Sequence, residues 1–259
     1  MIRIDIFLFS NGYAKSREAA RKSIDAGFVF VDGKQIMKPS EKIDESVEHV
    51  VEYKNAIPYV GRGGLKLEAA LDAFAVDPTS KKCIDVGAST GGFTDCLLKR
   101  GASMVYAVDS GREQLDAGLR SDNRVVSLEG VNARYLSSEI VPELMDIAVM
   151  DVSFISQTLI LPSLSPLLDP NGIAITLIKP QFECGREAIG KGGIVKKTEH
   201  RIGAVRRVAY AAEECGLYLI DIIRSPILGG DGNMEFLGLF SKTSRVPIET
   251  VISKVNYNC

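Results

Sequence analysis

Between residues 81 and 109, short hydrophobic runs alternate with turns, and each run ends in a glycine or an aspartate. The run at 83–86 has the length and composition of a buried parallel strand. A glycine-rich turn at 87–92 follows, and then apolar positions recur at helical spacing until Gly101. A second apolar run at 104–108 leads to Asp109. This order predicts the nucleotide-binding half of a doubly wound, Rossmann-like α/β sheet.

The same alternation continues towards the C-terminus and predicts the rest of that sheet. We expect strands at 125–128, 145–150, 173–178, 217–224 and 235–240, and helices at 113–119, 159–168 and 200–215. The glycine-rich segment 185–195 is expected to be a mobile loop. Because ligands of such sheets bind beyond the carboxyl ends of the strands, residues that follow those ends are the first candidates for chemistry.

The first 58 residues have a different pattern, which predicts a separate small α+β domain. A helix at 4–9 precedes a second helix that begins after Ser16, a good N-cap, and stops at Gly27. Asp32 and Gly33 form the expected turn of a hairpin, and another strand is expected at 47–53. We therefore expect one domain over 1–58, a linker over 59–64 and the α/β domain over 65–259.

The glycine-rich turn is neither G-x-G-x-x-G nor a P-loop, and it holds no basic residue that could meet a phosphate. Asp85 instead places a carboxylate beside the ligand, which favours a cation. S-adenosylmethionine carries a sulfonium and an ammonium, and its ribose suits Asp109. The alternative is that the glycines only make a tight turn. The candidate cofactor residues are Asp85, Gly87, Ala88, Ser89, Thr90, Gly91, Gly92, Phe93, Asp109, Asn132 and Asp151.

Composition narrows the class of protein. The chain has 259 residues, 46% of them hydrophobic, which is ample for a packed core, and a net charge of −2 gives no global nucleic-acid signal. Apolar runs are too short to span a bilayer, and the N-terminus does not resemble a signal peptide. Five cysteines without a CxxC pair favour the reducing cytoplasm over a disulfide framework or a metal site. With two histidines, a histidine-centred triad is not expected, and His49 is expected to be structural.

Basic residues gather locally at the N-terminus, on and around the second expected helix. Two arginines four positions apart share one face of that helix and could contact phosphates. The alternative is an ordinary solvated face. The candidate RNA-binding residues are Arg3, Lys15, Arg17, Arg21 and Lys22.

The two-helix order followed by Ala26-Gly27-Phe28-Val29-Phe30-Val31-Asp32-Gly33-Lys34 resembles the small S-four-type RNA-binding domain. The resemblance covers about 50 residues at the N-terminus. It implies binding to structured RNA through the second helix and the loop after it.

Four charged residues far apart in sequence stand at the ends of expected elements that could face one crevice: Lys66, Asp151, Lys179 and Glu235. With Asp85 and the glycine-rich turn, this set resembles the tetrad of the FtsJ-like (RrmJ) ribose 2′-O-methyltransferases. With the N-terminal domain, the chain resembles the TlyA, or hemolysin A, family. The matching segments are 60–67 (VGRGGLKL), 151–156 (DVSFIS), 177–183 (LIKPQFE) and 190–195 (GKGGIV).

The resemblance implies S-adenosylmethionine-dependent methylation of cytidine riboses in the RNA of the small and large ribosomal subunits. A ribose hydroxyl is a poor nucleophile, so a base and in-line positioning are needed. A lysine can be that base if burial or a nearby cation lowers its pKa. We expect Lys179 to be the base, Lys66 the nearby cation, Asp151 the group that orients Lys179, and Glu235 a partner of a lysine or of the ribose.

Two other activities compete with this interpretation. A non-enzymatic RNA-binding or assembly factor would keep the fold without needing two inward-facing lysines. A membrane-lytic protein, which the older family name suggests, would need a long apolar helix or alternating barrel strands, and neither pattern occurs in the sequence. Methyl transfer to RNA and leakage of liposomes would separate the three.

Overall fold

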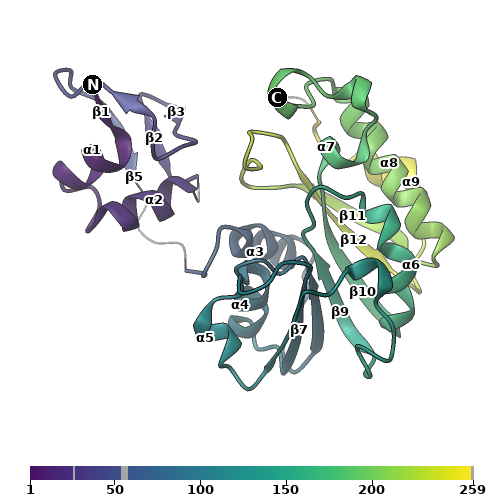
Figure 1. The fold of residues 1–259 in the computed structure, drawn as a ribbon. Helices are drawn as coiled ribbons and strands as arrows, with labels where there is room; N and C mark the ends of the chain where they lie inside the picture. Colours follow the sequence, from purple (N-terminus) through teal and green to yellow (C-terminus); the bar gives the residue numbers. More distant parts are fainter. Residues whose placement is uncertain (26, 54–57, 258–259) are drawn as a thin grey trace. The chain divides into compact units, whose positions relative to one another are not determined.

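The computed structural model describes residues 1–25, 27–53 and 58–257, and divides into two compact units, Met1–Arg62 and Gly63–Cys259. The predicted linker over 59–64 lies within the described residues, and the segment 54–57 before it does not. The predicted domain boundaries at 58 and 65 stay a prediction, and each unit is described by itself (Figure 1).

The first unit packs two helices against short antiparallel strands around a core of its own. Ser16 caps the second helix as predicted, since its Oγ accepts the Ala19 N–H at 3.0 Å. Asp32 and Gly33 both have positive φ, 52° and 74°, which makes the predicted hairpin turn. The elements are β1 Ile2–Arg3, α1 Ile4–Ser10, α2 Arg17–Asp25, β2 Val29–Val31, β3 Lys34–Gln35, β4 Lys42–Ile43 and β5 Val51–Tyr53.

His49 contacts the turn of that hairpin, in line with its predicted structural role. Its Nδ1 lies 2.7 Å from Asp32 Oδ2, and its Nε2 lies 2.9 Å from the Asp44 carbonyl oxygen. The strand predicted at 47–53 is shorter than expected, because only its last three residues pair with β2.

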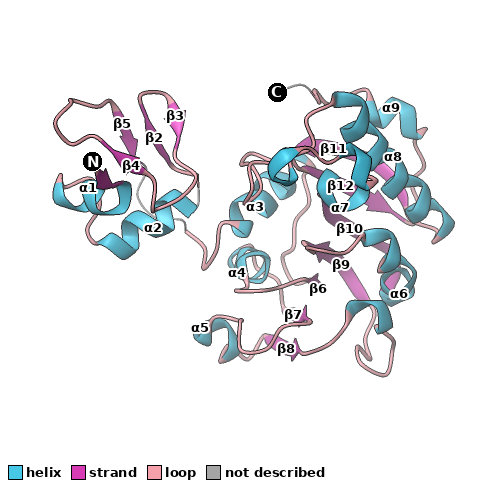
Figure 2. Ribbon diagram, turned by 45° about the horizontal axis from the view of Figure 1, so that its top comes forward, coloured by secondary structure: helices cyan, strands magenta, loops and turns pink. Residues whose placement is uncertain are grey.

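The second unit is a seven-stranded sheet in the order β11-β12-β10-β9-β6-β7-β8, with α3 and α4 on one side and α6 and α8 on the other (Figures 1 and 2). Strands β10, β9, β6, β7 and β8 are parallel, whereas β12 runs antiparallel to both its neighbours. The predicted doubly wound α/β class is confirmed. The first half contains α3 Gly63–Ala73, β6 Lys82–Val86, α4 Gly92–Lys99, β7 Met104–Asp109, α5 Ala117–Arg120, β8 Val125–Glu129, η1 Ala133–Tyr135 and β9 Met145–Met150.

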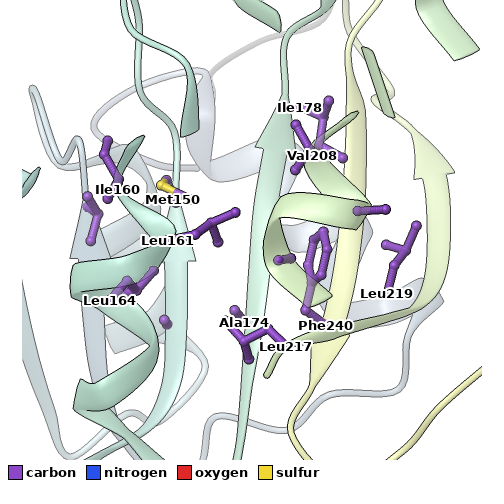
Figure 3. Close-up of a cluster of buried hydrophobic side chains, with 14 of the residues drawn as sticks. Met150, Ile160, Leu161, Leu164, Ala174, Ile178, Val208, Leu217, Leu219 and Phe240 are labelled. Atoms are coloured by element: carbon purple, nitrogen blue, oxygen red, sulfur yellow. The ribbon is translucent and has the colours of Figure 1, made fainter. Parts of the chain in front are cut away.

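The second half of the unit completes the sheet and supplies the helices that cover the side opposite α3 and α4. Side chains of α6 and α8, among them Leu161, Leu164 and Val208, pack in one buried cluster with side chains of β10 and β12. Phe240 of β12 lies in this cluster (Figure 3). The elements are η2 Gln157–Leu159, α6 Leu161–Leu164, η3 Ser165–Leu167, β10 Leu168–Ile178, α7 Pro180–Glu183, η4 Arg186–Ala188, η5 Lys191–Gly193, α8 Thr198–Glu214, β11 Tyr218–Arg224, β12 Phe236–Ser241 and α9 Ile248–Ile252. No helix among the described residues is long and apolar enough to cross a membrane.

Two helix predictions were wrong in extent. The segment 113–119 is mostly loop, because Glu129 Oε1 accepts the N–H groups of Gln114 and Leu115 and only the turn capped by Asp116 is helical. The helix predicted at 159–168 is broken into short turns, and Leu168 already belongs to β10. Pro166 interrupts it, since proline lacks the N–H that a continuing helix requires.

Candidate active site

Several candidate site residues lie where three adjacent parallel strands end. Strand β6 leads into the glycine-rich turn, β9 leads into Asp151, and β10 leads into Lys179. These strands are neighbours in the order β10-β9-β6, so the three loops share one edge of the sheet. Gly87 has φ +87°, and a Cβ built there would lie 2.5 Å from the Asp151 carbonyl oxygen. Only glycine allows the turn to approach Asp151 so closely.

Lys179 is buried and has two polar partners. Its Nζ lies 2.6 Å from Asp151 Oδ1 as an ion pair and donates a hydrogen bond to Ser153 Oγ at 2.8 Å. The predicted pairing of Asp151 with Lys179 is thus present in the structure. Ser153 was not predicted as a partner, although its position two residues after Asp151 was a signal that could have pointed to it.

Lys66 and Glu235 form a second ion pair, in which Nζ and Oε2 are 2.6 Å apart and both side chains are buried. A Cβ built on Gly63 would lie 3.8 Å from Asp151 Oδ2, and Lys66 follows one helical turn later in α3. The first turn of α3 is therefore near Asp151. Of the two partners predicted for Glu235, a lysine or the ribose, the structure shows the lysine. Glu235 balances the Lys66 charge, and the predicted role of Lys66 as the cation near Lys179 stays a prediction.

A cavity of about 470 Å³ opens beside Asp151. Of the eleven predicted cofactor residues, five line it: Gly87, Ser89, Asp109, Asn132 and Asp151. The sequence did not identify the other lining residues, Val108, Ser110, Gln114, Val131, Ala133, Arg134, Val152, Ser153, Phe154, Ile155 and Ile160. Three of them, Ser110, Ala133 and Val152, directly follow a predicted candidate, which was the signal available.

The remaining six predicted residues, Asp85, Ala88, Thr90, Gly91, Gly92 and Phe93, are not on the lining. Asp85 belongs to β6, and the other five build the turn and the start of α4. Asp85 is fully buried behind the turn, where its Oδ2 accepts a hydrogen bond from Thr94 Oγ1 at 2.7 Å and its Oδ1 has no hydrogen-bond partner. The pKa of Asp85 is raised to about 7, mainly by burial and also by the carboxylates of Asp151 and Asp109, against the opposing effect of the Thr94 hydrogen bonds.

Asp109 and Asn132 bind the backbone as well as facing the cavity. The carboxylate of Asp109 accepts the Ser89 N–H at 2.8 Å and the Gly111 N–H at 2.7 Å, which fixes the glycine-rich turn to the end of β7. Asn132 Oδ1 accepts the Arg134 N–H at 3.1 Å and caps η1. Each Asp109 oxygen retains a second lone pair that a ligand could use.

Phe154 is the most exposed large apolar side chain of the site, with 92% of its surface accessible. It lines the cavity, and its ring centroid lies 5.3 Å from that of Phe182 in α7. Its φ is +63°, which is unusual for a bulky residue and turns the chain sharply after Ser153.

In the first unit, three arginines converge on one buried carboxylate. Arg3, Arg17 and Arg21 bind Asp5 at 2.9, 3.3 and 2.9 Å, and each remains about half exposed. One carboxylate cannot neutralise three guanidinium groups, so an excess of positive charge faces solvent. The other two predicted RNA-binding residues are not in this cluster: Lys22 pairs with Glu18, and Lys15 is exposed.

We expect the Asp5 carboxylate to make the first unit sensitive to acid. Burial alone would raise its pKa, but hydrogen bonds from Arg3, Arg21 and Arg17 outweigh burial, and the net pKa lies well below its ordinary value. A carboxyl whose pKa is lower in the folded state stabilises the fold above its unfolded pKa of about 4 and loses that contribution as pH falls. The protection factors for hydrogen exchange in residues 1–53 of the full-length protein should therefore fall below about pH 4. Asp5→Asn should exchange about tenfold faster at pH 7 and respond less to acid; an unchanged acid response would contradict this role.

Comparison with known proteins agrees with both units. The family model for FtsJ-like methyltransferases matches residues 59–242, and the model for the S4 domain matches residues 2–49. The 16S/23S rRNA (cytidine-2′-O)-methyltransferase TlyA of Mycobacterium tuberculosis is 41% identical over 94% of this chain and 91% of its own length. Hemolysin A of Brachyspira hyodysenteriae is 42% identical over 92% and 99%. A solved Streptococcus thermophilus structure that carries a hemolysin name superposes with a TM-score of 0.75, at 42% identity over 98% of this chain and 94% of that chain.

These matches cover most of the chain, include both of its units and confirm the resemblance on which the sequence analysis relied. The chain belongs to the FtsJ-like methyltransferases with an N-terminal S4 domain, the family of the TlyA and hemolysin A proteins.

Proposed function

We propose that this protein transfers the methyl group of S-adenosylmethionine to the 2′-hydroxyl of cytidine in ribosomal RNA. The observation that carries the proposal is Lys179, a buried lysine held by Asp151 and Ser153, two residues that line the cavity beside the glycine-rich turn. The relatives named TlyA are described as acting on cytidine 2′-oxygens of 16S and 23S rRNA, or of 23S rRNA alone.

The cavity suits S-adenosylmethionine in size and in charge. It meets the glycine-rich turn at Gly87 and Ser89. Asp109 and Asp151 give it two carboxylates, which favour a positively charged ligand. Asp109 would bind the ribose diol, and Asn132 would border the adenine. When bound, S-adenosylmethionine supplies an electrophilic methyl group, whose bond to sulfur breaks with the electron pair remaining on sulfur.

Lys179 would act as the general base in this reaction. Its neutral amine takes the proton of the 2′-hydroxyl and becomes an ammonium while the oxygen forms its bond to the methyl carbon. Asp151 then stabilises that ammonium across 2.6 Å. Lys66 is held by Glu235 at the first turn of α3, where it can donate a hydrogen bond to the ribose. Most of the rate gain would come from positioning, because the hydroxyl must approach in line with the breaking bond.

Phe154 would stack on a nucleobase of the substrate. An aromatic ring that is 92% exposed at the mouth of the cavity gains contact area only when another flat group covers it. Phe154→Ala should raise the KM for RNA about tenfold and leave the affinity for S-adenosylmethionine within about twofold, because stacking contributes roughly 1–3 kcal/mol per base. Equal KM values for wild type and variant would rule out stacking by this ring.

RNA would also be bound by the cluster of Arg3, Arg17 and Arg21 on the S4 domain. Arg17→Ala and Arg21→Ala should each weaken RNA binding and reduce the slope of log K against log salt by about one, the signature of a lost phosphate contact. Arg206, paired with Glu249 on the second unit, offers the control: Arg206→Ala should leave the slope unchanged. Hydrogen exchange of residues 1–53 would show whether the variants remain folded, since both arginines also hold Asp5.

The direct test of the proposed activity is transfer of labelled methyl groups to separated ribosomal subunits and to protein-free rRNA. Incorporation into RNA by the wild-type protein is expected. Binding of S-adenosylmethionine without transfer to any of these RNAs would favour a non-enzymatic RNA-binding or assembly factor.

One name among the relatives, hemolysin A, favours a membrane-lytic activity as a second candidate. Leakage of a trapped dye from liposomes by pure protein tests it separately. We expect no leakage, because the protein is proposed to act on ribosomes in the cytoplasm.

A further inference from the structure

The two partners of Lys179 hold it in different ways. The contact with Asp151 at 2.6 Å is an ion pair that lacks the geometry of a hydrogen bond. The contact with Ser153 at 2.8 Å is a hydrogen bond. An ion pair depends on the charge of the lysine and weakens when the lysine is neutral. A hydroxyl oxygen accepts a hydrogen bond from an ammonium and from an amine alike. Ser153 is thus the partner that still holds Lys179 in the neutral form required of a base.

This hydrogen bond also restricts where the base can point. A neutral amine has two N–H groups and one lone pair in a tetrahedral arrangement around nitrogen. One N–H is directed to Ser153 Oγ, and the negative charge of Asp151 repels the lone pair and attracts the other N–H. The lone pair is left with the position that faces neither partner. Without Ser153, rotation about the last side-chain bond would let the lone pair point in several directions.

The loop that carries Ser153 is fixed to the segment that carries Lys179. Ser156 Oγ donates to Glu183 Oε2 at 2.5 Å, and the Gln157 N–H donates to Glu183 Oε1 at 2.9 Å. Glu183 is buried in α7, the helix that begins directly after Lys179. These bonds join the β9 and β10 loops, so the separation of Ser153 and Lys179 does not depend on a free loop.

We propose that Ser153 is a positioning residue that orients the Lys179 amine so that its lone pair meets the substrate hydroxyl. The inference rests on the proposed function, since it concerns the base of that reaction. Ser153 itself exchanges no proton with the substrate: the proton passes from the 2′-oxygen to Lys179. Its contribution should appear in the rate of the chemical step and not in the binding of either substrate.

The test compares Ser153→Ala, which removes the hydroxyl, with Ser153→Thr, which keeps it. Ser153→Ala should lower kcat about 10- to 100-fold, the cost of misplacing a reacting group by a fraction of an ångström to one ångström, and should change each KM less than about twofold. Ser153→Thr should recover most of the rate. Ser253→Ala serves as the control, because it removes an exposed serine hydroxyl whose partner among the described residues is the Thr250 carbonyl oxygen in its own turn. Raising the pH should not restore the Ser153→Ala rate, because the variant lacks the correct orientation of the Lys179 amine and not its neutral form.

Several results would overturn the proposal. Wild-type kcat in Ser153→Ala, or a full recovery of its rate at high pH, would show that orientation by the hydroxyl is unnecessary. A loss confined to KM for S-adenosylmethionine would assign Ser153 to cofactor binding. Crystal structures of the wild type and both variants give a readout independent of activity: Lys179 Nζ should stay beside residue 153 in the wild type and Ser153→Thr and leave in Ser153→Ala. If the wild type methylates no RNA, the proposed function fails, while these structures still decide whether Ser153 holds the amine.

Discussion

Replacing Lys179 by alanine is expected to lower kcat for RNA methylation at least about 100-fold, the usual contribution of a general base. The amine that lies 2.6 Å from Asp151 and 2.8 Å from Ser153 would be absent, and no other described lysine has these two partners. Binding of S-adenosylmethionine should change less than about threefold, because Lys179 is not among the residues that line the cavity. Single-turnover methylation and titration calorimetry measure the two quantities.

The matched control is Lys254→Ala, which removes a half-exposed lysine that also pairs with an aspartate, Asp221, away from the site. It should retain wild-type kcat. If Lys179→Ala keeps more than about a tenth of the rate while Lys254→Ala behaves as wild type, Lys179 is not the base. A loss of S-adenosylmethionine binding equal to the loss of rate would instead assign Lys179 to the cofactor.

The second large effect is expected on stability. Glu235→Ala should lower the free energy of unfolding of the second unit by about 3–5 kcal/mol, because it leaves the Lys66 charge buried without a partner. The side chains of Lys66 and Glu235 are only 5% and 3% exposed, so water cannot replace the lost carboxylate. Urea unfolding followed by circular dichroism measures this loss.

The double variant Lys66→Met with Glu235→Leu separates stability from function. A buried ion pair replaced by apolar groups of similar volume often costs little, so this variant should recover most of the stability lost in Glu235→Ala. It should remain inactive, since Lys66 can no longer donate a hydrogen bond to the ribose. Recovery of both stability and activity would show that this pair only fills the core. No recovery of stability would show that packing around the pair, and not the unpaired charge, determines the cost.

The order of strands and helices was predictable because the parallel strands are short apolar runs that end in glycine or a charged residue. The predicted strand 145–150 coincides with β9, and 104–108 falls one residue short of β7. Apart from the helix that Pro166 interrupts, the failures have tertiary causes. The N–H groups of Gln114 and Leu115 bind Glu129 on a neighbouring strand, and β1 pairs with β4 forty positions away in sequence. Local propensity contains no information about such partners.

The site was predictable to the level of its charged residues, and its pairing was predictable only in part. Position after a strand identified Asp151 and Lys179, whose pairing the structure shows. Position could not show that Lys66 is neutralised by Glu235, which is 169 residues away. It also could not show that Asp85, at the centre of the strongest motif, is fully buried behind the turn and bound by Thr94. Burial and the direction of a side chain are set by packing, which a motif does not contain.

The most direct test of the central claim is the chemical identity of the methylated nucleoside. Labelled rRNA from the transfer reaction would be digested to nucleosides and separated by chromatography with mass spectrometry, and the same RNA would be mapped by its resistance to alkaline cleavage. The proposed function predicts 2′-O-methylcytidine at an alkali-resistant position, and this product should be absent when Lys179→Ala replaces the wild type. A methyl group on a base carbon or nitrogen would contradict the account, because a base-directed transfer has no use for a lysine that deprotonates a ribose hydroxyl.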